Sequence, residues 1–407
     1  MIKKRKIFEK ILILGSSLEA LRAAELLAEH GFQILIVEKQ NHLHCKENIE
    51  TEILLDYISN TDIYNHNYIE KIVVDAKNKE KIRLIKNTEL IDLKGSVCDY
   101  EVYLRNNGSV TKEKFDGIIF APVIVPKSKK QPVADNYLPF CRFTEALEVA
   151  PAPEGIKFGK VIPGNIIFYI DEESLSRLVF SQVMDCADFC KKTFKTEVTI
   201  VTPDVLTSAI WLEMKYRSLR EEGIVFIKYE SVPKILHKDE KKITIQLQDI
   251  ENNGEILKTD MLVFSEKLVL SEYDRKLTKI LSLSDYKNIH FFSCKTPRKG
   301  IFICGRGRDD ILGFEAIGDA NECFLSVCEL FPDGSYQYEE NAIDVNKTKC
   351  TLCLTCVRTC PHKAIEFDSR NFEERAVKII EEACFRCGQC VSECPTKALS
   401  FIENEMG

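Results

Sequence analysis

Short apolar runs alternate along the chain with stretches in which apolar residues recur at helical spacing. Residues 11–14 form an uninterrupted apolar run, which predicts a buried strand. Apolar residues then recur through 21–28, which predicts a helix that ends at Gly31. A second apolar run at 34–37 predicts the next strand, so this part of the chain is a strand-helix-strand unit of a parallel sheet.

The same order of elements returns in the middle of the chain. Residues 165–170 predict a strand, about 174–193 predict a helix, and 197–201 predict the next strand. Further apolar runs at 260–265 and 300–304 predict two more strands, and a helix follows the second of them. This alternation predicts an α/β fold with Rossmann-type sheets.

Length and composition indicate several soluble domains. At 407 residues the chain exceeds one compact core, and about 150 residues per domain suggests two or three domains. The net charge of -7 argues against nucleic-acid binding, which needs a concentrated basic face. The longest apolar stretches, such as 118–125, are too short to span a bilayer, and no signal peptide is recognised. We therefore expect a cytoplasmic protein without a membrane span.

The cysteines add a specific chemistry to this picture, because eight of the seventeen fall into two identical motifs. Each motif reads C-x2-C-x2-C-x3-C-P, and the second repeats the first at an offset of 34 residues. Such runs hold 4Fe-4S clusters in bacterial ferredoxins, where the fourth cysteine binds the other cluster. We therefore predict two 4Fe-4S clusters, one held by Cys350, Cys353, Cys356 and Cys394, and the other by Cys384, Cys387, Cys390 and Cys360.

Two other interpretations of these motifs are weaker. Pairs of the type C-x2-C also hold zinc, but zinc sites use separated pairs of ligands and do not require twin four-cysteine runs. The clusters could also serve only to stabilise a domain that is too small for a large core. Two adjacent low-potential clusters fit a relay of single electrons better.

The turn after the first strand is a variant of the dinucleotide fingerprint. The pattern G-x-G-x-x-G appears here as Gly15, Ser17 and Ala20. Glu38 lies 23 residues beyond Gly15, where an acid binds a ribose hydroxyl. The helix amino terminus offers N–H groups to a phosphate, but Ser17 replaces the glycine that lets the backbone approach the pyrophosphate. The motif is therefore compatible with nucleotide binding and also with a scaffold that binds none.

The corresponding turn of the second unit has a different composition. Residues 171–174 carry three carboxylates and no glycine. Because these carboxylates would repel a pyrophosphate, we predict that the second domain has no NAD(P)H site.

Several segments together resemble the HdrA family of heterodisulfide reductase, the flavin and iron-sulfur component of that enzyme in anaerobic archaea and bacteria. The similarity covers nearly all of the chain, and the ferredoxin motifs are its most specific part. The other segments identify the family only in combination: the opening strand-helix-strand unit, residues 220–227, residues 300–305, and the pair Asp310 and Ile311.

The resemblance implies a thioredoxin-reductase-like scaffold of two Rossmann-type domains, followed by an α+β ferredoxin domain with two 4Fe-4S clusters. The expected boundaries are 1–150 and 268–331 for an FAD-binding domain, 151–267 for a second α/β domain, and 336–407 for the ferredoxin domain. FAD would lie in the first domain, with its isoalloxazine end at the turn after residue 304. The candidate FAD residues are Gly15, Ser16, Ser17, Glu38, Lys39, Gly305, Asp310 and Ile311.

The resemblance also implies a hetero-oligomeric redox complex. Members of the family exchange electrons with the HdrB and HdrC components and with a hydrogenase or formate dehydrogenase module, and many perform flavin-based bifurcation. Ferredoxin is a further candidate partner.

The chain departs from the family in several places. No C-x2-C occurs outside residues 350–390, so an inserted ferredoxin domain is lacking. Only Cys186 and Cys190 stand where family members carry a cysteine-rich motif, and two thiols are too few for a third cluster. Thioredoxin reductase activity is not expected either, because a redox-active C-x2-C is missing. The remaining cysteines are expected to be small buried hydrophobes.

Two sets of polar residues flank the candidate flavin site. His42, His44 and Cys45 follow Glu38 in a loop that either contacts flavin or metal or is simply solvated. Arg306 and Arg308 either pair with an anionic cofactor or partner, or are surface charges.

Two functions remain in competition. The first is an FAD-containing electron-transfer subunit, which Glu38 and Asp310 favour and which we take as the primary prediction. The second is a flavin-free adaptor that relays electrons only through its two clusters, which Ser17 and the acidic turn favour. Pro122 favours it too, because flavoproteins of the thioredoxin reductase type have a strand ending in A-T-G where this chain has Ala-Pro-Val. A stand-alone oxidoreductase is weaker than both, because no constellation of catalytic acid, base and nucleophile is recognised.

Overall fold

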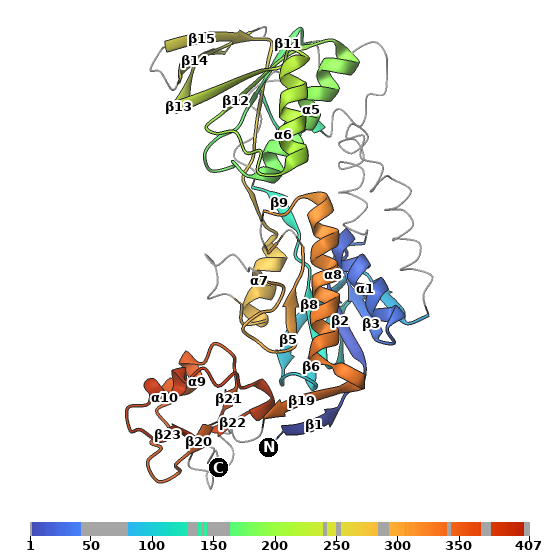
Figure 1. Cartoon of the computed structure of the whole chain (residues 1–407), viewed down its shortest axis with the longest axis vertical. Helices are drawn as coiled ribbons and strands as arrows, with labels where there is room; N and C mark the ends of the chain where they lie inside the picture. Colours follow the sequence, from blue (N-terminus) through green and yellow to red (C-terminus); the bar gives the residue numbers. More distant parts are fainter. Residues whose placement is uncertain are drawn as a thin grey trace.

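The computed structural model arranges the chain as three bodies, with two Rossmann-type domains above a smaller ferredoxin-type domain (Figure 1). The first domain lies in the centre of the view, the second at the top, and the ferredoxin-type domain at the lower left. The structure describes residues 2–41, 80–127, 137–140, 142–144, 163–238, 242–249, 254–283, 293–305, 307–308, 310–339, 343–367 and 376–402.

The first domain is built on a five-stranded parallel sheet. Its strand order is β18-β8-β2-β3-β4, so the strand contributed by the later part of the chain lies beside strands from the first part. Strands β2, β3, β8 and β18 are largely buried, which explains why they are nearly continuous apolar runs, whereas the edge strand β4 is only partly buried. Its strands are β2 (Lys10–Leu14), β3 (Gln33–Val37), β4 (Ile82–Ile85), β8 (Gly117–Phe120) and β18 (Ile301–Ile303).

Two layers cover this sheet. Helices α1 (Leu18–Glu29) and α8 (Gly313–Leu330) pack against each other, and α1 also contacts β2 and β3. A three-stranded antiparallel sheet supplies a further layer, through contacts of β7 with β2 and of β5 with β3. This sheet consists of β5 (Thr88–Lys94), β6 (Tyr100–Asn106) and β7 (Ser109–Phe115), and α7 (Glu272–Ile280) packs on β5.

The second domain has a seven-stranded mixed sheet in the order β10-β16-β11-β12-β13-β14-β15. Helix α5 (Arg177–Phe194) packs on β12, and α6 (Ile210–Glu221) packs on α5. The strands are β10 (Tyr137–Pro139), β11 (Asn165–Tyr169), β12 (Glu197–Thr202), β13 (Val225–Lys238), β14 (Ile243–Asp249), β15 (Gly254–Thr259) and β16 (Met261–Phe264).

The chain crosses between these two domains on a short antiparallel pair, β9 (Ile124–Pro126) with β17 (Leu268–Leu270). Strand β10 already pairs with β16 of the second sheet. The expected boundary at residue 150 is therefore too late for this strand, since a three-residue edge strand gives little periodic signal.

The ferredoxin-type domain has two interlocked halves. Strand β20 (Ile343–Val345) of the first half pairs with β23 (Leu399–Phe401) of the second, and β21 (Ile365–Glu366) pairs with β22 (Lys378–Ile379). The remaining elements are the short helices α9 (Thr355–Thr359), η3 (Glu381–Ala383) and α10 (Gln389–Ser392). Neither half completes a sheet alone, so the repeat seen in the sequence folds as one unit.

An antiparallel pair leads from the Rossmann body to this domain. It joins β1 (Ile2–Lys6) to β19 (Ser335–Glu339), which follows the single turn η2 (Pro332–Gly334). The α/β fold class with an added ferredoxin domain is thus confirmed. Among the described residues, no helix is both long and apolar enough to cross a membrane.

Candidate iron-sulfur and dinucleotide sites

Two cavities in the ferredoxin-type domain are each lined by four cysteines, three from one half and one from the other. We call them the outer site and the inner site. Cys350, Cys353, Cys356 and Cys394 line the outer site. Cys360, Cys384, Cys387 and Cys390 line the inner site. The structure thus brings together the two sets that the motif spacing predicts.

The backbone around each cavity follows the same unusual path in both halves. Leu352 and Leu354 have positive φ angles of 54° and 57°, and their counterparts 34 residues later, Arg386 and Gly388, have 56° and 78°. Leucine rarely adopts this conformation, which is costly unless the surroundings require it. The strained turns flank Cys353 and Cys387 and wrap the loop around the cavity.

Backbone N–H groups are directed at the sulfur atoms. Ala364 donates to Cys360 Sγ at 3.4 Å, and its counterpart Ala398 donates to Cys394 Sγ at 3.2 Å. Burial raises the pKa of the Cys390 thiol to about 11, so this thiol ionises at neutral pH only where a cation holds the thiolate. These features suit iron-bound thiolates.

The spread of the cysteines bears on the zinc interpretation. Each set of four cysteines, three from one half of the domain and one from the other, surrounds a hollow. A cube of four irons and four sulfides fits such an arrangement better than one tetrahedral zinc ion.

The inner site lies against the first Rossmann domain. Lys299 Nζ donates to the carbonyl oxygen of Cys384 at 2.8 Å and lies 4.9 Å from the centre of the Phe385 ring. His362, which lines the inner site, stacks on Phe385 and has its Nδ1 2.5 Å from the carbonyl oxygen of Pro297. Burial lowers the pKa of Lys299, and the Cys384 thiolate opposes this shift.

The dinucleotide turn of the first domain keeps its close approach to the neighbouring strand. Gly15 has a φ of +108°, and a Cβ there would overlap the carbonyl oxygen of Ala121. Ser17 caps α1 by accepting the N–H of Ala20 at 3.4 Å. Ser16 donates to Glu38 Oε2 at 2.5 Å, and both side chains are buried. The polar groups predicted to meet the ribose and the pyrophosphate thus bond to each other.

The opposite side of this turn is filled by Glu19. The Glu19 side chain covers the Cα of Gly305, where a Cβ would overlap it, and is only 4% exposed. Asp319 of α8 accepts the N–H of Gly305 and pairs with Arg308. The Gly305 turn is therefore occupied by the chain's own carboxylates.

These contacts test whether FAD fits the first domain. Ser16, Ser17, Glu19, Glu38 and Gly305 are all buried by protein atoms. The Glu19 carboxylate would also repel a phosphate placed between α1 and the Gly305 turn. In this packing these groups contact each other, and FAD contacts at these positions stay a prediction.

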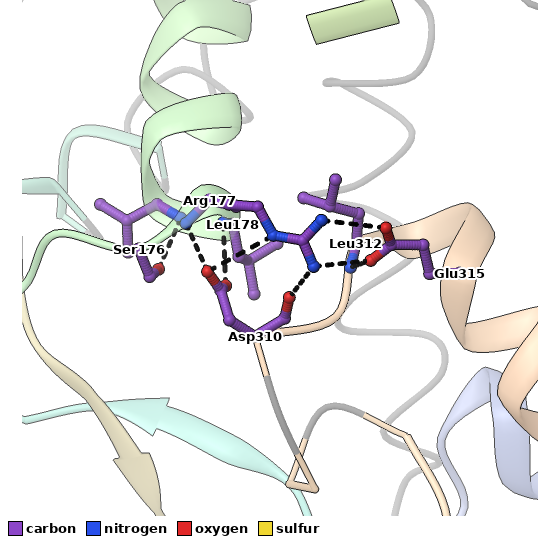
Figure 2. A network of polar contacts seen from close by, with 7 residues as sticks. Ser176, Arg177, Leu178, Asp310, Leu312 and Glu315 are labelled. Atoms are coloured by element: carbon purple, nitrogen blue, oxygen red, sulfur yellow. Dashed lines mark hydrogen bonds and ion pairs between the residues drawn. The ribbon is translucent and has the colours of Figure 1, made fainter. Parts of the chain in front are cut away.

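Asp310 takes part in the joint between the two Rossmann domains (Figure 2). The Asp310 carboxylate caps α5 by accepting the backbone N–H of Arg177 at 2.5 Å and that of Leu178 at 3.1 Å. Arg177 in turn donates to both carboxylate oxygens of Glu315 at 3.0 Å. Ile311 is buried. Asp310 thus holds the second domain to the segment that leads into α8, and Glu315 holds it to α8 itself.

The other candidates lie apart from the dinucleotide turn or outside the described residues. Lys39 is largely exposed and pairs with Glu89 at 3.5 Å. His42, His44, Cys45 and Arg306 lie outside the described residues.

The cysteines outside the motifs are mostly core residues. Cys186 and Cys190 are completely buried in the second domain, and burial raises the pKa of both thiols. In the first domain, the hydrogen bond from Cys323 is the largest single effect on Cys304 and lowers its pKa, but burial together with the nearby Asp319, Glu19 and Cys294 raises the pKa to about 11. These thiols are neutral packing groups.

Comparisons with known proteins identify the ferredoxin part by family. The model of the 4Fe-4S dicluster domain family matches residues 349–398. The HdrA component of ferredoxin:CoB-CoM heterodisulfide reductase from Methanosarcina acetivorans is 25% identical over 183 residues, which cover 43% of this chain and 22% of that protein. The corresponding component of the ferredoxin/F420H2-dependent enzyme from the same organism is 20% identical over 470 residues, covering 90% of this chain and 58% of that protein.

The Rossmann part is similar to a solved structure. Thioredoxin reductase of T. acidophilum matches with a TM-score of 0.52 at 14% identity, covering 79% of this chain and 98% of that one. The chain therefore belongs to the class of iron-sulfur proteins in which a dicluster domain is joined to a scaffold with the fold of thioredoxin reductase. Within this class the chain resembles the HdrA component of heterodisulfide reductase, which confirms the resemblance predicted from the motifs. The matched regions are less than two thirds of these relatives' own length.

Three residues that shape these sites were not predicted. Glu19 stands at an unrestricted position of the fingerprint, so only its buried contact with Gly305 reveals its role. Arg177 and Lys299 act on segments far away in the sequence. No local pattern marks such residues.

Proposed function

We propose that this chain is an electron-transfer subunit of a heterodisulfide-reductase-like complex, in which two 4Fe-4S clusters pass single electrons. The arrangement of each four-cysteine cavity, with three ligands from one half and one from the other, carries the proposal. Cys350, Cys353, Cys356 and Cys394 would hold the outer cluster. Cys360, Cys384, Cys387 and Cys390 would hold the inner one. The clusters supply the redox chemistry, and the chain sets their position, solvent access and local charge.

The exposure of the cysteines supports a route through the domain. Cys353 of the outer site and Cys387 of the inner site are both exposed to solvent, so a partner can approach either cluster closely. The inner site contacts the Rossmann body through Lys299 and His362. Components of the HdrB and HdrC type, a hydrogenase or formate dehydrogenase module, and a ferredoxin are candidate partners. The two relatives from Methanosarcina acetivorans are named for ferredoxin.

Iron analysis of cysteine variants tests the assignment of the ligands. Anaerobically purified protein should contain about eight irons per chain. Cys353→Ser and Cys387→Ser should each lose about half of the iron, because each removes a ligand from a different cluster. Cys328→Ser, outside the motifs and partly buried, should keep all of it. Equal iron in all variants, or stoichiometric zinc, would refute the proposal.

The source of the electrons has two candidates. The flavoprotein-type fold supports FAD in the first domain, as does Glu38 at the end of β3. The packing of Glu19 on Gly305 and the Glu38–Ser16 bond favour the flavin-free form, in which electrons come from a neighbouring redox protein. Flavin released by acid from the purified chain separates them. About one FAD per chain supports the first form, and its absence beside a full complement of iron supports the second.

A further inference from the structure

The two cluster sites differ in the cation that each one holds. Lys299 Nζ donates to the carbonyl oxygen of Cys384 at the inner site, at 2.8 Å. Arg358 Nη2 donates to the carbonyl oxygen of Cys353 at the outer site, at 3.1 Å. Each site therefore has one cation bonded to the backbone of a ligand cysteine.

The surroundings of the two cations are not equivalent. Arg358 is exposed, so water and salt screen its charge. Lys299 is partly buried at the contact between the domains, where its ammonium group lies over the Phe385 ring. A charge with less water around it acts more strongly on its neighbours.

The Rossmann body fixes the position of Lys299. The backbone carbonyl of Lys299 accepts the hydroxyl proton of the buried Tyr100 at 2.6 Å. The next cation and anion along this interface, Arg386 and Glu339, form an ion pair with each other. Arg386 also lines the inner site, but this ion pair offsets much of its charge, so Lys299, which bonds directly to the backbone of Cys384, is the main positive charge beside the inner site.

We propose that Lys299 raises the reduction potential of the inner cluster above that of the outer cluster, so that the inner cluster takes up the first electron. One-electron reduction adds one negative charge to a cube, with no bond made or broken. A nearby cation stabilises that added charge, and net charge and hydrogen bonding are among the factors that set cluster potentials. This inference rests on the proposed function, since it requires both clusters. Lys299 acts as a positioning and tuning residue and is not a ligand.

A potentiometric titration followed by electron paramagnetic resonance tests the proposal on the full chain with both clusters loaded. Wild-type protein should show two separate one-electron steps. Lys299→Met should move the step at higher potential to lower potential and leave the other step in place. Lys299→Arg should keep both steps, because it keeps the charge. Arg358→Met is the matched variant at the outer site. It should shift the reduction step of the outer cluster by less than Lys299→Met shifts that of the inner cluster.

A further variant separates charge from docking. Tyr336→Phe removes another bond between the domains, the one that Tyr336 donates to the carbonyl of Glu382 at 2.6 Å, without changing any charge. It should leave both steps in place. If it reproduced the shift seen in Lys299→Met, loosened docking would explain the shift and the proposal would be wrong.

The assignment of the steps uses a variant that lacks the outer cluster. In Cys353→Ser the remaining step should be the one that responds to Lys299→Met, and a remaining step that ignores Lys299 overturns the proposal. If Cys353→Ser assembles no cluster, the titration of the single Lys299→Met variant still tests the proposal. The proposal requires that one and only one of its two reduction steps shift, and a shift of both or of neither contradicts it. Wild-type protein without two steps contradicts the proposed function, whereas two steps that do not respond to Lys299 contradict only this inference.

Discussion

Substitution of Gly305 by alanine probes the closed state of the dinucleotide turn. The residue has a φ of +82°, a conformation that costs alanine about 1–2 kcal/mol. Its new Cβ would also lie under 3.0 Å from three atoms of the Glu19 side chain, which is only 4% exposed and has little room to move. Such overpacking costs about 1–3 kcal/mol. The total destabilisation of the first domain should therefore be about 2–5 kcal/mol.

A double-mutant cycle isolates the part that comes from Glu19. The double variant Gly305→Ala/Glu19→Ala should be about 1–3 kcal/mol more stable than the sum of the two single-variant losses predicts. The new Cβ no longer clashes with Glu19, so for Gly305→Ala only the backbone cost remains. For a domain of this size that corresponds to about 2–12 °C in the thermal midpoint. Scanning calorimetry or circular dichroism of the four proteins, measured side by side, supplies the cycle.

A glycine elsewhere in the same domain is the matched control. Gly108 has a φ of +85°, and a Cβ there would have no neighbour within 4 Å. Gly108→Ala should therefore carry only the backbone cost and should be additive with Glu19→Ala. Additivity for the Gly305 pair as well would refute the closed turn, and with it the argument from packing against FAD.

Three further predictions concern the joints and the metal. Arg177→Met should destabilise the joint between the Rossmann domains by about 1–3 kcal/mol, because the partly buried bidentate pair with Glu315 is lost, whereas loss of the exposed Arg217 should change the thermal midpoint little. Asp116→Ala leaves the N–H groups of residues 8 and 10 without their acceptor and should lower the free energy of unfolding by about 2–4 kcal/mol. The midpoint of urea unfolding measures this loss, and a loss below about 0.5 kcal/mol would contradict the prediction. Removal of iron by a chelator should unfold residues 343–402 while the Rossmann domains stay folded, measured by hydrogen exchange, and continued protection of the ferredoxin-type domain would contradict this.

The fold and the cluster sites could be predicted from the sequence because their signals are local. The strands of the first sheet are continuous apolar runs, and the two cysteine motifs carry their own spacing. The crossover of ligands followed from the general ferredoxin pattern, and the cavities bring the same two sets together. Where one short motif contains most of a site, sequence is sufficient.

The rest of the candidate site depends on contacts between distant segments. Glu19 and Gly305 meet only because α1 and α8 pack against each other. Asp310 was predicted at a flavin, but its carboxylate caps α5, whose first residue is 133 positions away. Lys299 reaches Cys384 across 85 positions. Such pairs have no periodic or motif signal, so they require the tertiary structure.

The proposed function requires that this chain hold two 4Fe-4S clusters that each carry one electron. Electron paramagnetic resonance of the fully reduced, anaerobically purified chain tests it most directly. Two clusters predict signals that integrate to about two spins per chain and that broaden through mutual interaction, since the two sites share one small domain. About one spin, or no signal from a protein that contains zinc, would contradict the claim.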